Sequence, residues 1–195
     1  MDGPNLKERD YCKKGHDDDL IIRTLLSREL LNDKTIHTID VDKDLFFNNT
    51  DVDLILVNKH YNLTTVEVKA DGFPEIRGTK YVFLELISNS VKYNNTNGQE
   101  GLGCCLTSKA KYFIFYFIKY DKYLILESQK LREFIKNNSE NYEHKQAKTW
   151  APDNSCVWYC TDGIVVPVQD LVDGAAGIVK NSRYKYLDIK SELSL

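Results

Sequence analysis

The sequence predicts a fold of the α/β class, because a helical pattern near the N-terminal end is followed by several strand patterns and a second helical pattern. Residues 17–32 place apolar side chains near a 3.6-residue period behind three aspartates, as in an amphipathic helix with an acidic first turn. Residues 128–137 show the same period behind Ser128, which favours a helix start. The strand patterns are short, rich in β-branched or aromatic residues, and lie at 35–41, 52–58, 63–70, 81–87, 111–118 and 122–127.

Tight turns join four of these strands in pairs, so we expect two hairpins. The first turn is the polar segment 59–62, and the second contains Tyr120 and Asp121. The other segments are expected to be a surface loop at 88–101, a short helix at 103–110, a linker or long loop after 138, a strand at 163–168 and a helical turn at 168–172.

The chain is long enough for one domain with a good core, since it has 195 residues. Residues 1–16 lack periodicity and are expected to form an N-terminal arm. Residues 17–138 form the predicted core, and residues 139–195 are a C-terminal extension of unknown role.

The composition is that of an ordered protein, with 42% hydrophobic and 28% charged residues. We expect no membrane contact, because the longest apolar stretch, 112–118, has seven residues where a spanning helix needs about 20. The N-terminus lacks a secretion signal, and five cysteines, an odd number, suit free thiols in a reducing interior. We therefore expect an intracellular, cytoplasmic protein. A net charge of -3 counts against nucleic-acid binding, although carboxylates that hold a cation also make the balance negative.

Charged residues stand at a suggestive spacing on the first predicted hairpin. Glu67 and Lys69 share one face of their strand, because alternate side chains point the same way, while Val66 and Val68 point to the core. Asp53 begins the partner strand, and a tight hairpin brings it opposite the Glu67 to Lys69 end. The three side chains are thus expected to converge.

Two converging carboxylates are suitable ligands for a hard divalent cation such as Mg²⁺, for which Mn²⁺ can substitute. Such a cation lowers the pKa of a bound water and neutralises charge on phosphate oxygens. A nearby lysine can orient that water. The pattern therefore indicates a hydrolytic centre for phosphodiesters, with Asp53 and Glu67 as metal ligands and Lys69 as the third catalytic residue.

Asp53 followed by Glu67-Val68-Lys69 on the next strand resembles the motif of the PD-(D/E)XK, or restriction-endonuclease-like, nuclease superfamily. The order of predicted elements is similar too. The resemblance covers roughly residues 15–135. It implies a restriction-endonuclease-like α/β core, in which helices flank a mixed central β-sheet.

The resemblance also implies further ligands. These are the backbone carbonyl of Val68 and, on the first helix, Glu29, which is otherwise a helix-surface charge. Segments 79–85 and 101–112 are similar to phage-type members. The chain departs from them in having Lys111 where an Asp is usual, and it lacks a proline before Asp53.

Simpler interpretations exist for each residue. Glu67 and Lys69 can form an ion pair on a solvated sheet face, and Asp51 is either a helper or a solvent residue. Glu85 can face the site or pair with a lysine. A zinc site would need the two ends of the chain to meet, and its candidate ligands are Cys12, His16, Cys156 and Cys160.

The expected function is that of a Mg²⁺-dependent endonuclease acting on DNA, with a homodimer as a further expectation. Lys109 and Lys111 are candidates for backbone contacts, within a larger basic rim that includes Lys119, Lys122, Lys130 and Arg132. The alternatives are an RNA-directed or exonucleolytic member of the same superfamily, and a non-cutting domain that binds nucleic acid or protein. The Asn- and Lys-rich composition, together with the segments similar to phage-type members, indicates a virus or mobile element, in which case the location is the host cytoplasm.

Overall fold

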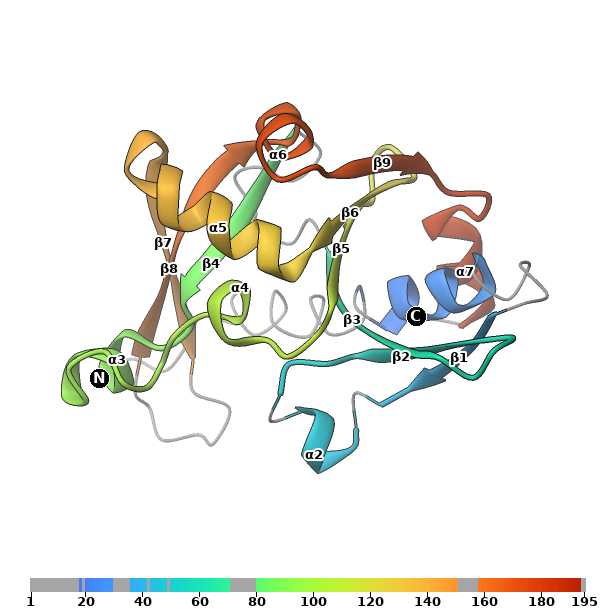
Figure 1. The fold of residues 1–195 in the computed structure, drawn as a ribbon, viewed down its shortest axis with the longest axis horizontal. Helices are drawn as coiled ribbons and strands as arrows, with labels where there is room; N and C mark the ends of the chain where they lie inside the picture. Colours follow the sequence, from blue (N-terminus) through green and yellow to red (C-terminus); the bar gives the residue numbers. More distant parts are fainter. Residues whose placement is uncertain are drawn as a thin grey trace.

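The structure is a computed structural model in which two β-sheets and several helices enclose the core (Figure 1). It describes residues 18, 20–29, 36–41, 43–48, 50–70, 80–150 and 158–193. The predicted N-terminal arm, with Cys12 and His16, lies outside the described residues, as does Cys156.

Six of the described strands form the main sheet, in the order β1-β2-β3-β5-β6-β9. β3 and β5 are parallel, and every other neighbouring pair is antiparallel, so the sheet is mixed. This confirms the predicted α/β fold with a mixed sheet and helices. The strands are β1 (Ile36–Asp40), β2 (Leu54–Asn58), β3 (Leu63–Ala70), β5 (Tyr112–Phe117), β6 (Lys122–Glu127) and β9 (Ile178–Asn181).

A second, antiparallel sheet has the order β4-β8-β7 among the described strands. These are β4 (Tyr81–Ile87), β8 (Trp158–Pro167) and β7 (Glu143–Trp150). The prediction of a linker beyond Asn138 is wrong for β7. This strand lies at the edge of its sheet and is polar, with Gln146 Nε2 donating to Asp162 Oδ2 over 3.0 Å, so it shows no apolar alternation.

Helices cover one face of the main sheet. Helix 20–29 packs four buried residues, Ile21, Ile22, Leu25 and Leu26, against Leu54, Val66 and Val68. Helix α7 (Tyr186–Glu192) joins the same core and contacts helix 20–29 and Asp18. The Tyr186 hydroxyl donates to Asp18, and Arg28 Nη1 lies 2.5 Å from Glu192 Oε2.

The opposite face of the main sheet packs against the second sheet and helix α5 (Ser128–Asn138). Buried phenylalanines of β5 meet Leu84 of β4, Ile164 of β8 and Leu131 of α5. The short helix α4 (Cys104–Thr107) adds two buried cysteines to this core. Apolar side chains therefore fill the space between the two sheets, except where polar side chains enter it.

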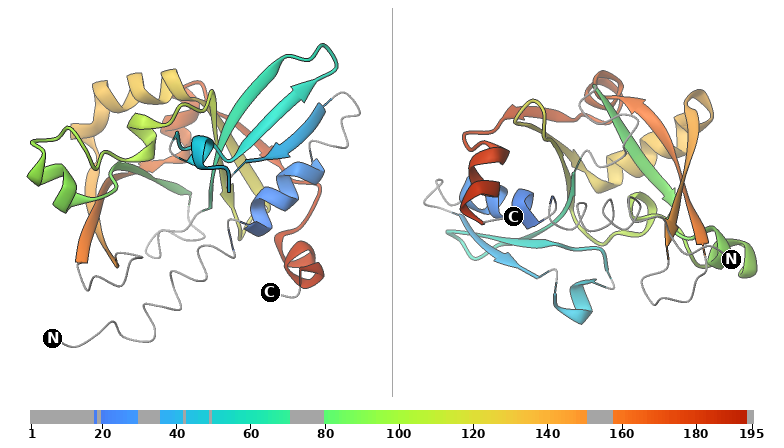
Figure 2. Two further views of the ribbon diagram at one scale, coloured as in Figure 1. Left: turned by 90° about the horizontal axis from the view of Figure 1, so that it is seen from below. Right: turned by 180° about the vertical axis from the view of Figure 1, so that it is seen from behind.

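The remaining elements complete the connections. The expected loop 88–101 contains helix α3 (Ser90–Asn95), which lies beside β8 at one end of the molecule (Figure 2). The β2–β3 hairpin projects at the other end. Residues 139–195 contribute strands to both sheets, and the short elements are α2 (Leu45–Asn48), η1 (Ser139–Asn141) and α6 (Val168–Gly174). Within the described residues, no helix combines the length and apolar character that a membrane crossing requires.

Candidate active site

The β2–β3 hairpin brings Asp53 and Glu67 together. Its register pairs Leu54 with Val66, and Asp53 directly precedes Leu54 while Glu67 directly follows Val66. The Asp53 amide donates to the Val66 carbonyl over 3.0 Å, and the Asp53 charge acts on Glu67. Val66 and Val68 are buried under helix 20–29, so Glu67 and Lys69 face the second sheet, as alternation along the strand requires.

Glu67 has a buried carboxylate, and one of its two oxygens has no hydrogen-bond partner among the described residues. Its side chain is 2% exposed, and its Oε1 lies 2.5 Å from Lys69 Nζ. Its Oε2 is the oxygen that lacks a partner in the part of the chain that the structure describes. A buried oxygen left without a partner costs free energy, so this atom indicates a ligand position.

The electrostatic surroundings keep Glu67 protonated more readily than an ordinary glutamate. Burial raises its pKa from 4.5 to about 8, Lys69 opposes this rise, and Asp53 and Asp51 add to it. Desolvation lowers the pKa of Lys69, but Cys104, Glu67 and Asp53 outweigh it and raise that pKa above its ordinary value. Lys69 is therefore the cation that compensates the acids around it.

Asp53 is held by the backbone of the neighbouring strand. Its Oδ2 accepts a 2.7 Å hydrogen bond from the amide of Val68, the residue between Glu67 and Lys69. On its other side, Arg23 Nη1 of helix 20–29 lies 3.8 Å from Asp53 Oδ1. Arg23 also lies near Asp40 at the end of β1, with 3.7 Å between Nε and Oδ2.

Sequence reasoning missed Arg23 and gave little weight to Glu85. Arg23 is 8% exposed, and the sequence feature that could have identified it is a charged residue on the buried side of the helix. Burial raises the pKa of Glu85 on β4, while Lys69 and the backbone amide of Cys104 lower it. Glu85 is thus close to Lys69. The sequence feature that could have identified it is a carboxylate inside an otherwise apolar strand.

Gly103 allows α4 to approach Glu85. A Cβ at residue 103 would lie 2.4 Å from the Glu85 carbonyl oxygen and 2.9 Å from its Cγ, distances that no side chain can accept. The small residue therefore lets the Cys104 amide reach the Glu85 carboxylate. The second sheet contributes to the site through this contact.

Asp51 belongs to the surroundings of the site. Its Oδ2 accepts a 3.1 Å hydrogen bond from Thr107 Oγ1, and its carbonyl accepts one of 2.6 Å from Ser108 Oγ. It occupies the left-handed region, with φ of 50°. Asp51 is thus anchored to the end of α4, while its charge still raises the pKa of Glu67 and Glu85.

The structure does not bring Glu29 to this site. Glu29 lies on the other face of the main sheet and accepts hydrogen bonds from the Arg183 amide at 2.8 Å and from Ser182 Oγ at 3.3 Å. Arg183 Nε lies 3.3 Å from its other oxygen. Glu29 therefore fastens the segment between β9 and α7 to helix 20–29.

The two candidate lysines lie at the entry of β5, beside the acidic residues. The Lys109 amide donates to the Thr50 carbonyl at 2.8 Å, and the Lys111 amide donates to the Thr65 carbonyl at 3.0 Å. Both side chains are exposed. These bonds place the backbone of Lys109 beside the residue that precedes Asp51, and the backbone of Lys111 beside β3.

The donors present fit Mg²⁺ better than a softer ion. Across the described ranges, no three His, Cys, Asp or Glu side chains are grouped so that they could hold a metal ion. Mg²⁺ needs no such group, because it is commonly held by one or two carboxylates and keeps several waters. Asp53 and the open Oε2 of Glu67 match that requirement.

Fold and site together define an α/β protein with a buried glutamate, a half-buried aspartate and a lysine. Searches with this sequence match no family model and no curated protein. One similar solved structure is described as a nuclease from a fusselovirus. It has a TM-score of 0.31 and 14% identity, with 87% of this chain and 88% of that one covered. Similarity this distant supports no conclusion about function, so the site residues alone carry the argument below.

Because folding raises the pKa of Glu67 to about 8, we expect the metal-free protein to lose stability as pH rises from about 4.5 to about 8. Over this interval the folded chain keeps the Glu67 proton and the unfolded chain releases it, so the folded state binds more protons and stability falls. Urea unfolding in EDTA between about pH 5 and about pH 8 measures the slope. Glu67→Gln should flatten it, and an unchanged slope in that variant would contradict the assignment.

Proposed function

We propose that this protein is a metal-dependent nuclease that hydrolyses DNA phosphodiester bonds internally, using Mg²⁺ or, as a substitute, Mn²⁺. The observation that carries the proposal is the buried, unpartnered Oε2 of Glu67, which stands opposite Asp53 and beside Lys69. This arrangement supports a PD-(D/E)XK-type centre.

Each residue has a distinct role in the proposal. Asp53 and Glu67 hold the ion, and the carbonyl of Val68 is a third ligand. When bound, Mg²⁺ supplies positive charge at the phosphate and acidifies a coordinated water. Glu67 must be deprotonated to act as a ligand, and loss of its proton is favoured by the adjacent Lys69.

Lys69 serves the reaction through its position. Its amine touches Glu67 Oε1, so it can donate a hydrogen bond to the attacking water while that water is aimed at phosphorus. As the bond to the leaving oxygen breaks, negative charge grows on the phosphate, and a fixed ammonium stabilises this charge. The proton of the water passes to solvent or to an acceptor near the metal.

Lys109 and Lys111 provide the backbone contacts. Both side chains are exposed, and their backbone amides bond to Thr50 and Thr65, close in sequence to Asp53 and Glu67, so they can bind phosphates near the scissile bond. We also propose a homodimer, since two strands require two centres. Sedimentation velocity measures this directly.

A covalently closed plasmid provides the test, because it has no ends for an exonuclease. We expect nicking in Mg²⁺ and Mn²⁺ and none in EDTA, and we expect Asp53→Asn to reduce the rate about a hundred-fold or more. Asp40→Asn is the matched control, since Asp40 also lies near Arg23 but outside the acidic pair. It should cut within a few-fold of wild type.

Two results would overturn the proposal. The first is the absence of cleavage with either ion, which would leave a binding domain. The second is an Asp53→Asn variant as active as wild type. A parallel reaction with closed circular RNA reports the choice of nucleic acid.

A further inference from the structure

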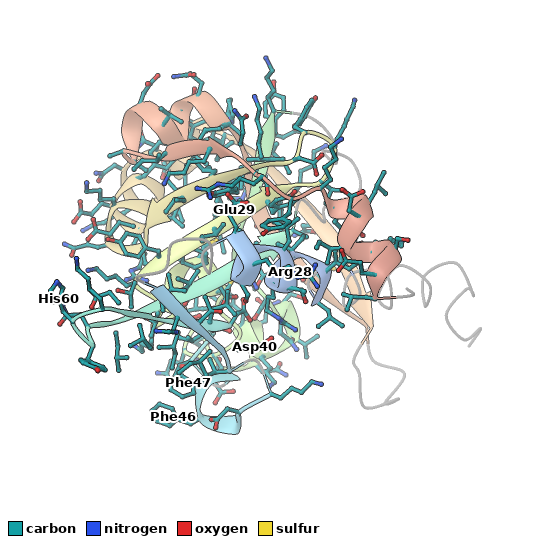
Figure 3. All side chains as sticks on the ribbon, turned by 90° about the vertical axis from the view of Figure 1, so that its right-hand side faces the viewer. Arg28, Glu29, Asp40, Phe46, Phe47 and His60 are labelled. Atoms are coloured by element: carbon teal, nitrogen blue, oxygen red, sulfur yellow. The ribbon has the colours of Figure 1, made fainter. Side chains whose placement is uncertain are left out.

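A phenylalanine on the segment that leads to Asp51 and Asp53 projects into solvent. Phe46 of α2 is 70% exposed, the largest value for a phenylalanine among the described residues. Figure 3 shows it at the margin of the molecule, beyond its neighbour Phe47. Single exposed apolar residues are common, and Phe46 differs from them in the bonds that hold its segment and in its neighbours.

The segment around Phe46 is built to hold the ring in place. Asp44 Oδ1 accepts hydrogen bonds from the amides of Phe46, at 2.9 Å, and Phe47, at 3.3 Å. The Phe47 carbonyl in turn accepts from Thr50 Oγ1 at 2.8 Å and from the Val52 amide at 3.2 Å. The four-residue helix is therefore closed at both ends by specific bonds.

Phe47 anchors this segment to the protein. Its ring packs against the buried cluster of Val41, Val52 and Ala110. The Phe46 ring meets it edge to face, with 5.2 Å between centroids and an angle of 88°. Phe46 thus presents an aromatic surface to water on a rigid support, at little cost in side-chain entropy on binding.

The surroundings of Phe46 are those of the proposed nucleic-acid path. The chain runs from α2 directly into Asp51 and Asp53, and the Lys109 amide bonds to the Thr50 carbonyl within that connection. Ala110, which packs under Phe47, lies between the two exposed lysines Lys109 and Lys111. Proteins that bind single-stranded nucleic acid combine aromatic rings, on which bases stack, with cations that contact the phosphates.

We propose that Phe46 stacks on an unpaired nucleobase of the strand that enters the active site, an inference that rests on the proposed nuclease function. The base must be unpaired because, in a continuous duplex, each base face is covered by its neighbours. Stacking on a ring tolerates any base, so Phe46 selects for strand structure and not for sequence. A protein partner would use the same apolar surface, and the experiment below separates the two.

The probe is a short fluorescein-labelled oligothymidylate, bound without metal so that no cleavage occurs. Phe46→Ala should weaken its binding about five-fold to 150-fold, the range expected for one lost stacking contact. The same strand paired with oligoadenylate should bind wild type and variant with similar affinity. Tyr61→Ala is the matched control, because Tyr61 is 86% exposed but lies in the hairpin turn away from the acidic pair.

A second readout reports contact directly. In Phe46→Trp the new indole should be quenched by oligothymidylate beyond the change seen in the parent protein, and Tyr61→Trp should show no added quenching. The inference is overturned if Phe46→Ala binds the strand as wild type does, or if it converts a dimer to a monomer in sedimentation. Plasmid cleavage that depends on Asp53 would survive either result, so the proposed function is tested separately.

Discussion

Glu67→Gln is expected to reduce plasmid cleavage about a hundred-fold or more while the protein remains folded. The substitution keeps the size of the side chain but removes the charge that a divalent ion needs from its ligand. Mutation of a residue that hydrogen-bonds to a metal ligand already reduces metal affinity or activity about 10- to 100-fold. Mutation of a direct ligand should therefore reduce activity by at least the upper end of that range. Initial nicking rates in Mg²⁺, with folding checked by circular dichroism, measure the effect.

The same variant should resist urea better than wild type at about pH 8 in EDTA. Burial makes ionised Glu67 unfavourable, and glutamine carries no charge to desolvate. Substitution of a functional residue is expected to lower activity and to leave stability equal or higher. Substitution of a structural residue is expected to lower stability as well. Glu127→Gln, at the partly exposed end of β6, is the matched control and should change neither property appreciably. Wild-type cleavage by Glu67→Gln would refute the proposed centre.

Lys69→Met is expected to lower kcat by about 10²- to 10³-fold, the usual cost of losing one group that stabilises charge in the transition state. Methionine retains much of the apolar stem, so the variant should fold. The pH profile provides a second readout. Lys69 opposes the rise in the pKa of Glu67, so without the lysine the activity should require a higher pH.

A lysine that only pairs with Glu67 would shift the pH profile in the same way but would leave kcat at the optimal pH unchanged. Lys92→Met, on the exposed surface of α3, is the matched control and should behave as wild type. Retention of wild-type kcat in Lys69→Met would show that the amine does not take part in the reaction. Loss of binding alone, with kcat intact, would assign Lys69 to substrate contact only.

The acidic pair and its lysine could be placed from sequence because they depend on short-range geometry. One hairpin brings Asp53, just before β2, near Glu67, and alternation along a strand determines the face that Lys69 shares with Glu67. Local pattern also predicted the β5–β6 hairpin and helix α5 almost to the residue. These features need no knowledge of what the rest of the chain does.

The other contributors to the site depend on contacts between distant segments. Glu85 reaches Lys69 only because the second sheet packs against the main one, and Arg23 reaches Asp53 only because helix 20–29 crosses the start of β2. All four side chains of the short strand β9 are exposed, so its sequence pattern does not predict a strand of the main sheet. It belongs to that sheet because its backbone pairs with β6. Such pairings are tertiary and leave little trace in a local window.

The bonds that α7 makes to helix 20–29 have a consequence for how the chain matures. Arg28 and Glu192 are 164 positions apart, and Tyr186 bonds to Asp18, so these links can form only after α7 has been synthesised. Contacts of such long range are slow to form. Helix 20–29 therefore folds against the main sheet before it can complete its contacts with α7.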